Sequence, residues 1–179
     1  MINESLPTIN STNEYLKKKI KLASLMPSPY AIVSEEQSGG YGQHKRSWYS
    51  PRGGLYFSFY AKCNEEAQVL LEKHLTLEVG NLLKSCVETI TALSCQIKEP
   101  NDIYVQGKKL AGILVETVSR GKMAEAVIIG VGLNVNTMMF PEELSATSLK
   151  IETGRDYDIK SLANNLYDDL CQTILPMLE

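Results

Sequence analysis

The chain has 179 residues, of which 44% are hydrophobic and 22% charged, and its formal net charge is −3 at pH 7. This balance is typical of a globular protein with a core, and it gives no electrostatic reason to expect a nucleic acid or an anionic membrane as partner. The sequence shows no signal-peptide pattern and no membrane-length apolar run, and its scattered cysteines argue against a zinc site, so we expect one cytoplasmic domain over residues 1–179 with reduced thiols.

The first predicted element is a helix over residues 12–26. Ser11 and Glu14 have the spacing of a capping box, in which side chains satisfy free backbone N–H groups of the first helical turn. The run Ser11, Thr12 and Asn13 therefore suits a helix cap, but two hydroxyls and an amide at a helix N-terminus also suit a polar, neutral ligand. The residues alone leave both interpretations open.

A short strand is predicted at 30–33, and a polar, glycine-rich loop follows at 35–47. Its glycines let the backbone bend sharply and approach a ligand closely. Lys45 and Arg46 add positive charge, and Trp48 adds an aromatic face. Such a loop suits a phosphate group, although a mobile surface loop has a similar composition.

Helices and strands then come in mixed order. Residues 55–61 alternate as a strand, and apolar residues of helical period predict a long helix over 65–93 that bends near Gly80. The remaining predicted elements are strands at 95–97, 103–105, 108–116 and 125–131, a short helix at 141–144 and a terminal helix at 158–178. Tight turns between neighbouring strands favour hairpins. We therefore predict an α+β domain with a mixed, largely antiparallel sheet and with helices packed on one face.

The segment 98–116, which reads KEPNDIYVQGKKLAGILVE, concentrates chemically active side chains. Asn101 and Asp102 stand at the start of one strand of a predicted hairpin, and the returning strand carries Lys109 among small and apolar residues. A lysine on an edge strand can simply protect the sheet from aggregation. A lysine beside such a run can also hold an anion, and the local pattern does not separate the two.

A second group of polar side chains follows the strand at 125–131. The segment 130–136 reads GVGLNVN and places Asn134 and Asn136 just beyond two glycines. These amides suit hydrogen bonds aimed into a site, but asparagine is also common in turns that need left-handed backbone.

The order and spacing of these motifs resemble the catalytic domain of biotin protein ligases. The resemblance rests on STN at 11–13, the Gln-and-glycine loop at 37–46, WYSP at 48–51, KEPNDIYVQGKKLAGILVE at 98–116 and IGVGLNVN at 129–136. It implies an α+β fold like that of class II aminoacyl-tRNA synthetases. It also implies an ATP- and Mg²⁺-dependent ligase that adenylates biotin to biotinyl-5′-AMP and then transfers the biotinyl group to a lysine of a biotin carboxyl carrier domain, as in acetyl-CoA carboxylase.

The resemblance also implies roles for individual residues. Lys109 would offset the repulsion between the biotin carboxylate and the α-phosphate, with Asp102 and Arg46 as further catalytic residues. The expected biotin-binding residues are Ser11, Thr12, Asn13, Gln37, Gly40, Tyr41, Lys109, Gly112 and Ile113. The expected ATP- and adenylate-binding residues are Gln43, Arg46, Trp48, Asn101, Lys109 and Asn134. Asn101 and Asp102 are the expected ligands of Mg²⁺.

The sequence departs from the family pattern in two places. The loop at 40–48 reads GYGQHKRSW, where family members commonly carry several arginines, so Tyr41 and Gln43 bring no positive charge to a phosphate. This difference predicts weaker loop closure or weaker retention of the adenylate. Glu99 replaces an aromatic residue close to the expected polyphosphate position, which predicts a lower affinity for ATP.

The residues before Ser11 leave no room for the helix-turn-helix domain of some family members, so we expect no DNA binding. The chain ends at Glu179, where many members continue into a small β-barrel. The expected partner is the biotin carboxyl carrier protein of a biotin-dependent carboxylase, with no membrane association, and the expected state is a monomer or a weak homodimer. Two alternatives stay open: a lipoate or other acyl–protein ligase of the same fold, and a degenerate biotin-binding module without catalysis.

Overall fold

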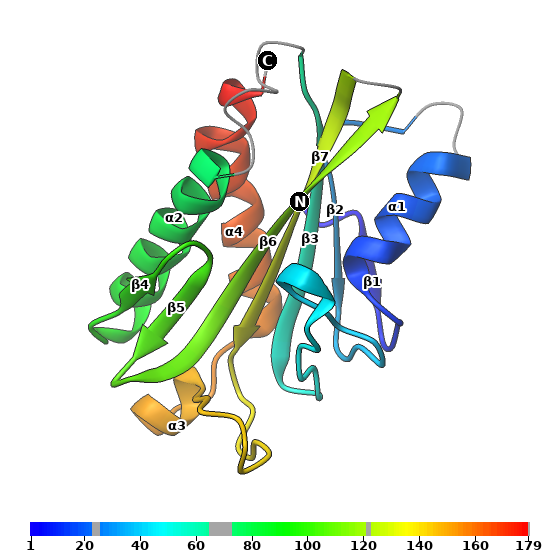
Figure 1. The fold of residues 1–179 in the computed structure, drawn as a ribbon. Coiled ribbons are helices and arrows are strands. Elements are labelled where there is room, and N and C mark those ends of the chain that lie inside the picture. Colours follow the sequence, from blue (N-terminus) through cyan, green and yellow to red (C-terminus); the bar gives the residue numbers. More distant parts are fainter. Residues whose placement is uncertain (23–25, 65–72, 121–122, 179) are drawn as a thin grey trace.

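The structure is a computed structural model that describes residues 1–22, 26–64, 73–120 and 123–178. Seven strands within these residues form one sheet in the order β1-β2-β3-β7-β6-β5-β4 (Figure 1). The strands are β1 (Glu4–Leu6), β2 (Tyr30–Ser34), β3 (Gly54–Lys62), β4 (Gln96–Lys98), β5 (Asp102–Val105), β6 (Lys108–Arg120) and β7 (Met123–Asn134). Only the pairing of β1 with β2 is parallel among these strands, which confirms the mixed, largely antiparallel sheet.

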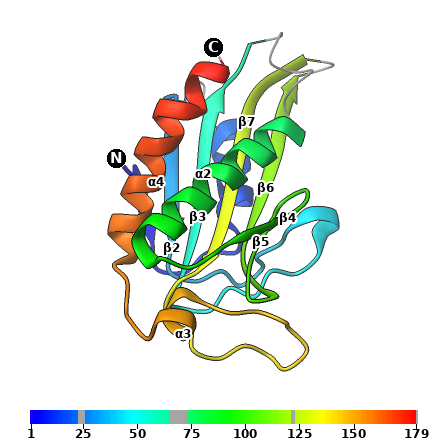
Figure 2. The ribbon, with the colours of Figure 1, turned by 90° about the vertical axis from the view of Figure 1, so that its left-hand side faces the viewer.

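Helices cover both faces of this sheet. The described helices are α1 (Thr12–Leu22), α2 (Lys73–Thr91), α3 (Leu149–Thr153) and α4 (Ile159–Thr173), with the 3₁₀ turns η1 (Gln43–Lys45) and η3 (Leu175–Met177). Figures 1 and 2 show α2 and α4 side by side on one face, with α1 on the opposite face. The α+β class is therefore confirmed, but the prediction that helices pack on one face holds for α2 and α4 and not for α1.

The central strands explain why both faces need cover. Phe57 and Phe59 of β3 point into the main core under α2 and α4, whereas Tyr60 points to the smaller core under α1. Successive residues of a strand point to opposite faces, and all three side chains are buried because helices cover both faces. Both faces of this strand are therefore buried, and its alternating side chains do not distinguish a buried face from a solvent-exposed one.

Several predicted boundaries differ from the structure. The first helix begins at Thr12 as predicted, and its described part runs to Leu22. Residues 23–25 lie outside the described chain, as does the predicted helical segment 65–72. The short helix predicted at 141–144 is wrong, since these residues form a turn. The short helix is α3 instead, which Ser148 caps through its side chain and Gly154 ends with left-handed backbone.

Two further differences lie at the ends of the chain. The terminal helix stops at Thr173, and the 3₁₀ turn η3, which contains Pro176, follows it. Strand β1 was not predicted; it is a short, polar edge strand held by its pairing with β2. None of the described helices is both long and apolar enough to span a membrane.

Candidate active site

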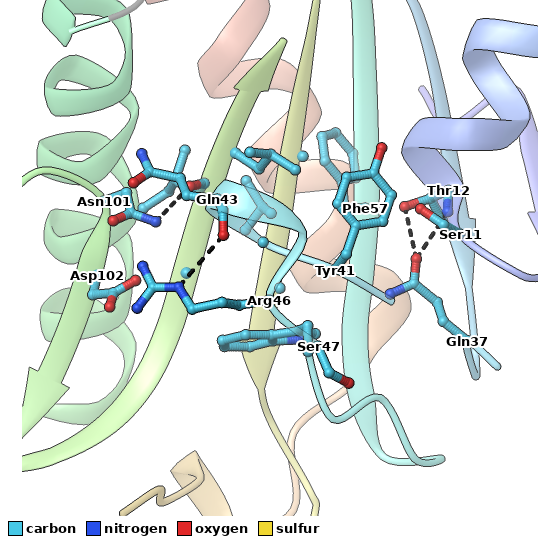
Figure 3. Close-up of a pocket in the computed structure, with 18 of the residues that line it drawn as sticks. Ser11, Thr12, Gln37, Tyr41, Gln43, Arg46, Ser47, Phe57, Asn101 and Asp102 are labelled. Atoms are coloured by element: carbon cyan, nitrogen blue, oxygen red, sulfur yellow. Dashed lines mark hydrogen bonds between the residues drawn. The ribbon is translucent and has the colours of Figure 1, made fainter. Parts of the chain in front are cut away.

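A cavity opens on the face of the sheet that carries α1, next to the N-terminus of that helix (Figure 3). The loop between β2 and β3 forms one wall, and β6 and β7 form the floor. The predicted site residues that line this cavity are Ser11, Thr12, Gln37, Tyr41, Gln43, Arg46, Trp48, Asn101, Asp102, Lys109, Gly112 and Ile113. Segments far apart in sequence thus meet in one place.

Three predicted site residues lie outside this lining. Asn13 is buried behind it, and Gly40 packs against Gln37 and Ser50 within the loop. Asn134 lines a second, neighbouring cavity.

Bare backbone forms the floor of the cavity. Gly112 of β6 pairs with Gly132 of β7, and both lie under the indole of Trp48. A Cβ at Gly132 would lie 2.6 Å from Trp48 Nε1, and a Cβ at Gly112 would lie 3.1 Å from Trp48 Cζ3. Gly130 lies under Asn13 in the same way, so only glycine at these positions admits such close contacts.

Sequence reasoning assigned no site role to Gly130 and Gly132, although a signal was present. The two glycines are two positions apart on one strand, and residues at that spacing line the same face of a sheet. They mark where a side chain or a ligand approaches the backbone.

The α1 end of the cavity is polar and neutral. Gln37 Oε1 accepts hydrogen bonds from Thr12 N at 2.8 Å and Thr12 Oγ1 at 3.1 Å, and Gln37 Nε2 donates to Ser50 Oγ at 3.1 Å. Behind them, the buried hydroxyl of Ser58 hydrogen-bonds Thr12 Oγ1 and the side chain of Asn13. This set of hydroxyls and amides suits a ligand group that is polar but carries no charge.

The opposite end of the cavity is charged. Lys109 Nζ lies 2.7 Å from Asp102 Oδ2 and 5.0 Å from the centre of the Trp48 ring. The other oxygen, Asp102 Oδ1, and Trp48 Nε1 are buried and have no hydrogen-bond partner within the described chain. An unpartnered buried carboxylate oxygen is costly, so this end suits a further cation or hydrogen-bond donor.

A β-bulge aims Lys109 into the cavity. Ile103 pairs with Ala111 and Tyr104 pairs with Lys109, so Leu110 is the extra residue on β6. Regular alternation from Gly112 would turn Lys109 into the main core, but Leu110 and Ala111 both enter that core instead. The extra residue therefore reverses the phase and directs the lysine to the cavity side.

The loop side chains reach toward this charged end. Figure 3 shows Arg46 and Gln43 extending toward Asn101 and Asp102, while Tyr41 lies near Ser11 and Thr12. Arg46 is exposed, with its Nε 3.5 Å from the carbonyl of Gln43.

Glu99 lies outside this group of side chains. It is exposed and lines a separate pocket with His74, Leu77 and Pro100. The structure thus separates Glu99 from the cavity near which the sequence placed it.

The charged end can contribute to a metal site, although no dense cluster is present. Among the described residues, no three His, Cys, Asp or Glu side chains lie close enough together to hold a metal ion. Asp102 Oδ1 nevertheless has no hydrogen-bond partner in the described part of the chain, and it lies beside Asn101, whose amide nitrogen donates to Ile113 O at 3.1 Å. Mg²⁺ is commonly bound by one or two carboxylates together with water and substrate phosphates, so this donor set fits it.

A second cavity adjoins the first at Trp48. Trp48 and Lys109 line both cavities, and the second cavity also involves Asn134. The segment around Ser145 and Ala146 closes it, because the backbone of Lys109 pairs with this segment. No pattern in that segment pointed to a site.

Comparison with known proteins identifies the family. A family model described as the biotin/lipoate A/B protein ligase family matches residues 5–134. The chain belongs to the biotin/lipoate A/B protein ligase family. Within this family, the bifunctional ligase/repressor BirA of Escherichia coli (strain K12) is 35% identical over 131 residues, which are 73% of this chain and 39% of BirA. The chain therefore spans well under half the length of that relative.

Solved structures of family members share the fold. The biotin protein ligase from Aquifex aeolicus in complex with biotin and ATP has a TM-score of 0.80 and 33% identity, and the match covers 96% of this chain and 70% of that one. The biotin protein ligase from Leishmania major in complex with biotinyl-5-AMP has a TM-score of 0.76 and 25% identity, covering 93% of this chain and 72% of that one.

Proposed function

We propose that this chain is an ATP-dependent biotin–protein ligase. The observation that carries the proposal is the position of Lys109, whose side chain lies where two neighbouring cavities meet. A reaction that joins a carboxylate to a phosphate must bring two anions together, and a cation between them offsets their repulsion and stabilises the charge of the transition state.

The first cavity suits biotin. Its neutral polar end at Thr12 and Gln37 offers donors and acceptors to the ureido ring, and its floor of glycine backbone admits a flat bicyclic group. In this orientation the valerate carboxylate extends toward Lys109. The expected contacts of Ser11, Tyr41 and Ile113 with biotin belong to the same proposal.

The second cavity suits the nucleotide. Asn134 and Trp48 line it. Arg46 and Gln43, which line the neighbouring first cavity, would bind the phosphates. Asn101 and Asp102 would hold Mg²⁺, which supplies positive charge to the phosphates when it is bound.

The proposed reaction has two steps. A carboxylate oxygen of biotin attacks the α-phosphorus of ATP, the bond to the β-phosphate breaks, and pyrophosphate leaves. The ε-amine of a carrier lysine then attacks the acyl carbon, and AMP leaves. The amine loses a proton in this step, and we propose the carboxylate of Asp102, which is paired with Lys109, as its acceptor. We propose the biotin carboxyl carrier domain of a carboxylase as the acceptor.

The test is pyrophosphate exchange into ATP with biotin, lipoate or octanoate as the acid. Exchange that depends on biotin is the expected result. Exchange with lipoate or octanoate alone would instead identify a different acyl–protein ligase. Tight binding of biotin without any exchange would identify a binding module.

A further inference from the structure

The tip of the cavity loop is closed on itself. Gly42 N donates to Arg46 O at 2.8 Å, and Arg46 N donates to Gln43 O at 3.2 Å. His44 and Lys45 have φ values of 55° and 59°, a left-handed backbone conformation that residues other than glycine rarely adopt. Such a turn needs support from its surroundings, because each left-handed residue costs free energy.

Tyr41 provides a connection from this tip to the rest of the molecule. Its hydroxyl donates to Glu14 Oε1 at 2.7 Å, lies 3.0 Å from Glu116 Oε2, and accepts from Lys17 Nζ at 3.1 Å. Lys17 also bridges the carboxylates, at 3.1 Å from Glu14 and 2.7 Å from Glu116. A phenol from the loop thus completes a cluster built by α1 and β6, which we call the Tyr41 clamp: Glu14, Lys17, Tyr41 and Glu116.

Lys45 balances the charge of the clamp. Its Nζ lies 3.5 Å from Glu14 and 3.8 Å from the centre of the Tyr41 ring, so the loop brings its own cation. Two carboxylates then face two ammonium groups, and the hydrogen bond from Tyr41 together with that from Lys17 lowers the pKa of Glu14 to about 2. The Tyr41 pKa is raised, first by burial and then by Glu14, so its hydroxyl keeps its proton.

The clamp is also connected to the polar end of the cavity. Glu116 accepts a hydrogen bond from Asn13 Nδ2 at 2.9 Å. The Ser58 hydroxyl forms hydrogen bonds to both Asn13 and Thr12 and so connects them. The Tyr41 ring itself lines the cavity. The position of this wall therefore depends on whether the hydroxyl of Tyr41 is docked.

We propose that Tyr41 is a positioning residue, whose hydroxyl docks the loop tip on Glu14, Lys17 and Glu116 and thereby holds the loop-side wall of the substrate cavity in place. This role is separate from the contact with biotin that the family resemblance implies for Tyr41. Its effect on catalysis rests on the proposed function, but the docking of the loop does not.

The docking is tested by limited trypsin digestion without ligand, with cleavage after Lys45 or Arg46 located by mass spectrometry. Tyr41→Phe keeps the ring and removes the hydroxyl, and we expect cleavage in the loop to be about tenfold faster than in the wild type. The matched control is Tyr15→Phe, because Tyr15 donates to Glu4 Oε2 at the same 2.7 Å from the same helix but away from the cavity. Equal loop cleavage in Tyr41→Phe and wild type would overturn the clamp.

The consequence for the site is tested by steady-state pyrophosphate exchange. For Tyr41→Phe we expect the KM for biotin to rise about tenfold while kcat changes less than about twofold, because a displaced wall weakens binding and leaves the reacting groups in place. An unchanged KM together with faster loop cleavage would refute the effect on the cavity. Absence of exchange in the wild type would refute the proposed function and leave the digestion result standing.

A second variant keeps the test decisive should Tyr41→Phe fold poorly. Glu14→Gln retains an acceptor for the Tyr41 hydroxyl but removes the charge that faces Lys17 and Lys45. We expect its loop cleavage to be about threefold faster than in the wild type. In the double variant, we expect the two effects to combine to less than their product, because both act on one hydrogen bond. Wild-type loop cleavage in Glu14→Gln alone would overturn the clamp, as would independent multiplication of the two effects in the double variant.

Discussion

Lys109 Nζ and Asp102 Oδ2 lie 2.7 Å apart across the bulged pairing of β5 and β6. The pair joins a cation at the meeting point of two cavities to a carboxylate whose second oxygen is buried and has no hydrogen-bond partner among the described residues. The ammonium is thus held in position by one anion while remaining in contact with both cavities. A preorganised charge of this kind needs little rearrangement when a substrate anion arrives.

Replacing Lys109 by alanine should strongly slow adenylation while the protein remains folded. The side chain is partly exposed and faces a cavity, so its removal leaves the main core intact. We expect biotin-dependent pyrophosphate exchange to fall by roughly a hundred- to a thousandfold, which is typical for loss of one group that stabilises transition-state charge. The matched control is Lys108→Ala at the neighbouring exposed lysine, which should exchange normally. Comparable rates in the two variants would refute the role of Lys109.

Replacing Ser58 by alanine should reduce both stability and biotin affinity. The Ser58 side chain is fully buried, and its hydroxyl joins Thr12 to Asn13. Its loss leaves buried polar partners unsatisfied, which costs about 1–3 kcal/mol in the free energy of unfolding. Urea denaturation measures the first effect, and titration with biotin measures the second.

Ser34→Ala separates the two effects of Ser58. The Ser34 hydroxyl is also buried, but it donates to the carbonyl of Glu36 outside the cavity. We expect a loss of stability without a loss of affinity in this variant. An unchanged biotin affinity in Ser58→Ala would contradict the assignment of this end of the cavity to the ligand.

The parts of the site that lie close together in sequence could be predicted. Ser11, Thr12 and Asn13 begin a helix that its own capping pattern locates, and Asn101 and Asp102 begin a strand beside a turn. Each of these positions follows from local chemistry, since caps and turns select particular side chains.

The direction of side chains and the distant contacts could not be predicted in this way. Alternation would place Lys109 and Gly112 on opposite faces, and only a bulge that leaves no local signature puts them together. Tyr41 meets Glu116 across 75 positions of sequence, so no periodicity links them. The cover of the second sheet face by α1 depends equally on tertiary packing, which the apolar pattern of one strand does not reveal.

The acid stability of the protein should depend on Glu14. Its pKa in the folded protein is about 2, below its ordinary value of 4.5, chiefly because Tyr41 and Lys17 donate hydrogen bonds to the carboxylate. A lowered pKa means that the stabilisation is fully present above about pH 4.5 and is lost as the pH falls toward 2. The groups that face this carboxylate are Lys17, Tyr41 and Lys45. Glu116 is bound by the same Lys17 and Tyr41 side chains.

Urea denaturation of wild type and Glu14→Gln at several pH values checks this prediction. The wild type should be the more stable at pH 6, and the difference between the two should shrink as the pH falls below about 4.5. Subtracting the free energy of unfolding of the variant from that of the wild type removes the contribution of other acids, including Glu4. Burial raises the pKa of Glu4, but its hydrogen bonds to Lys19 and Tyr30 outweigh this effect and lower the pKa overall. A difference that stays constant down to pH 3 would contradict the assigned pKa.

Replacing Gly132 by alanine should displace the indole of Trp48 and weaken ligand binding. The added Cβ would lie 2.6 Å from Trp48 Nε1, closer than nonbonded atoms approach, so the ring must move away from the sheet. Trp48 is the sole tryptophan in the chain, so intrinsic fluorescence reports its displacement directly. We expect a shift of the emission maximum and at least a tenfold loss of biotin affinity, the order expected for a misplaced contact group.

Gly80→Ala is the matched control for Gly132→Ala. Gly80 lies inside α2, and a Cβ there would meet Ile97 Cδ1 at 3.8 Å, which is ordinary van der Waals contact. Alanine is favoured over glycine in a helix by about 0.5–1 kcal/mol, so this variant should be more stable in urea and unchanged in fluorescence and affinity. If Gly132→Ala also kept the wild-type emission and affinity, the close packing of Trp48 on the sheet would not depend on the absence of a side chain at Gly132. That result would contradict the description of the cavity floor.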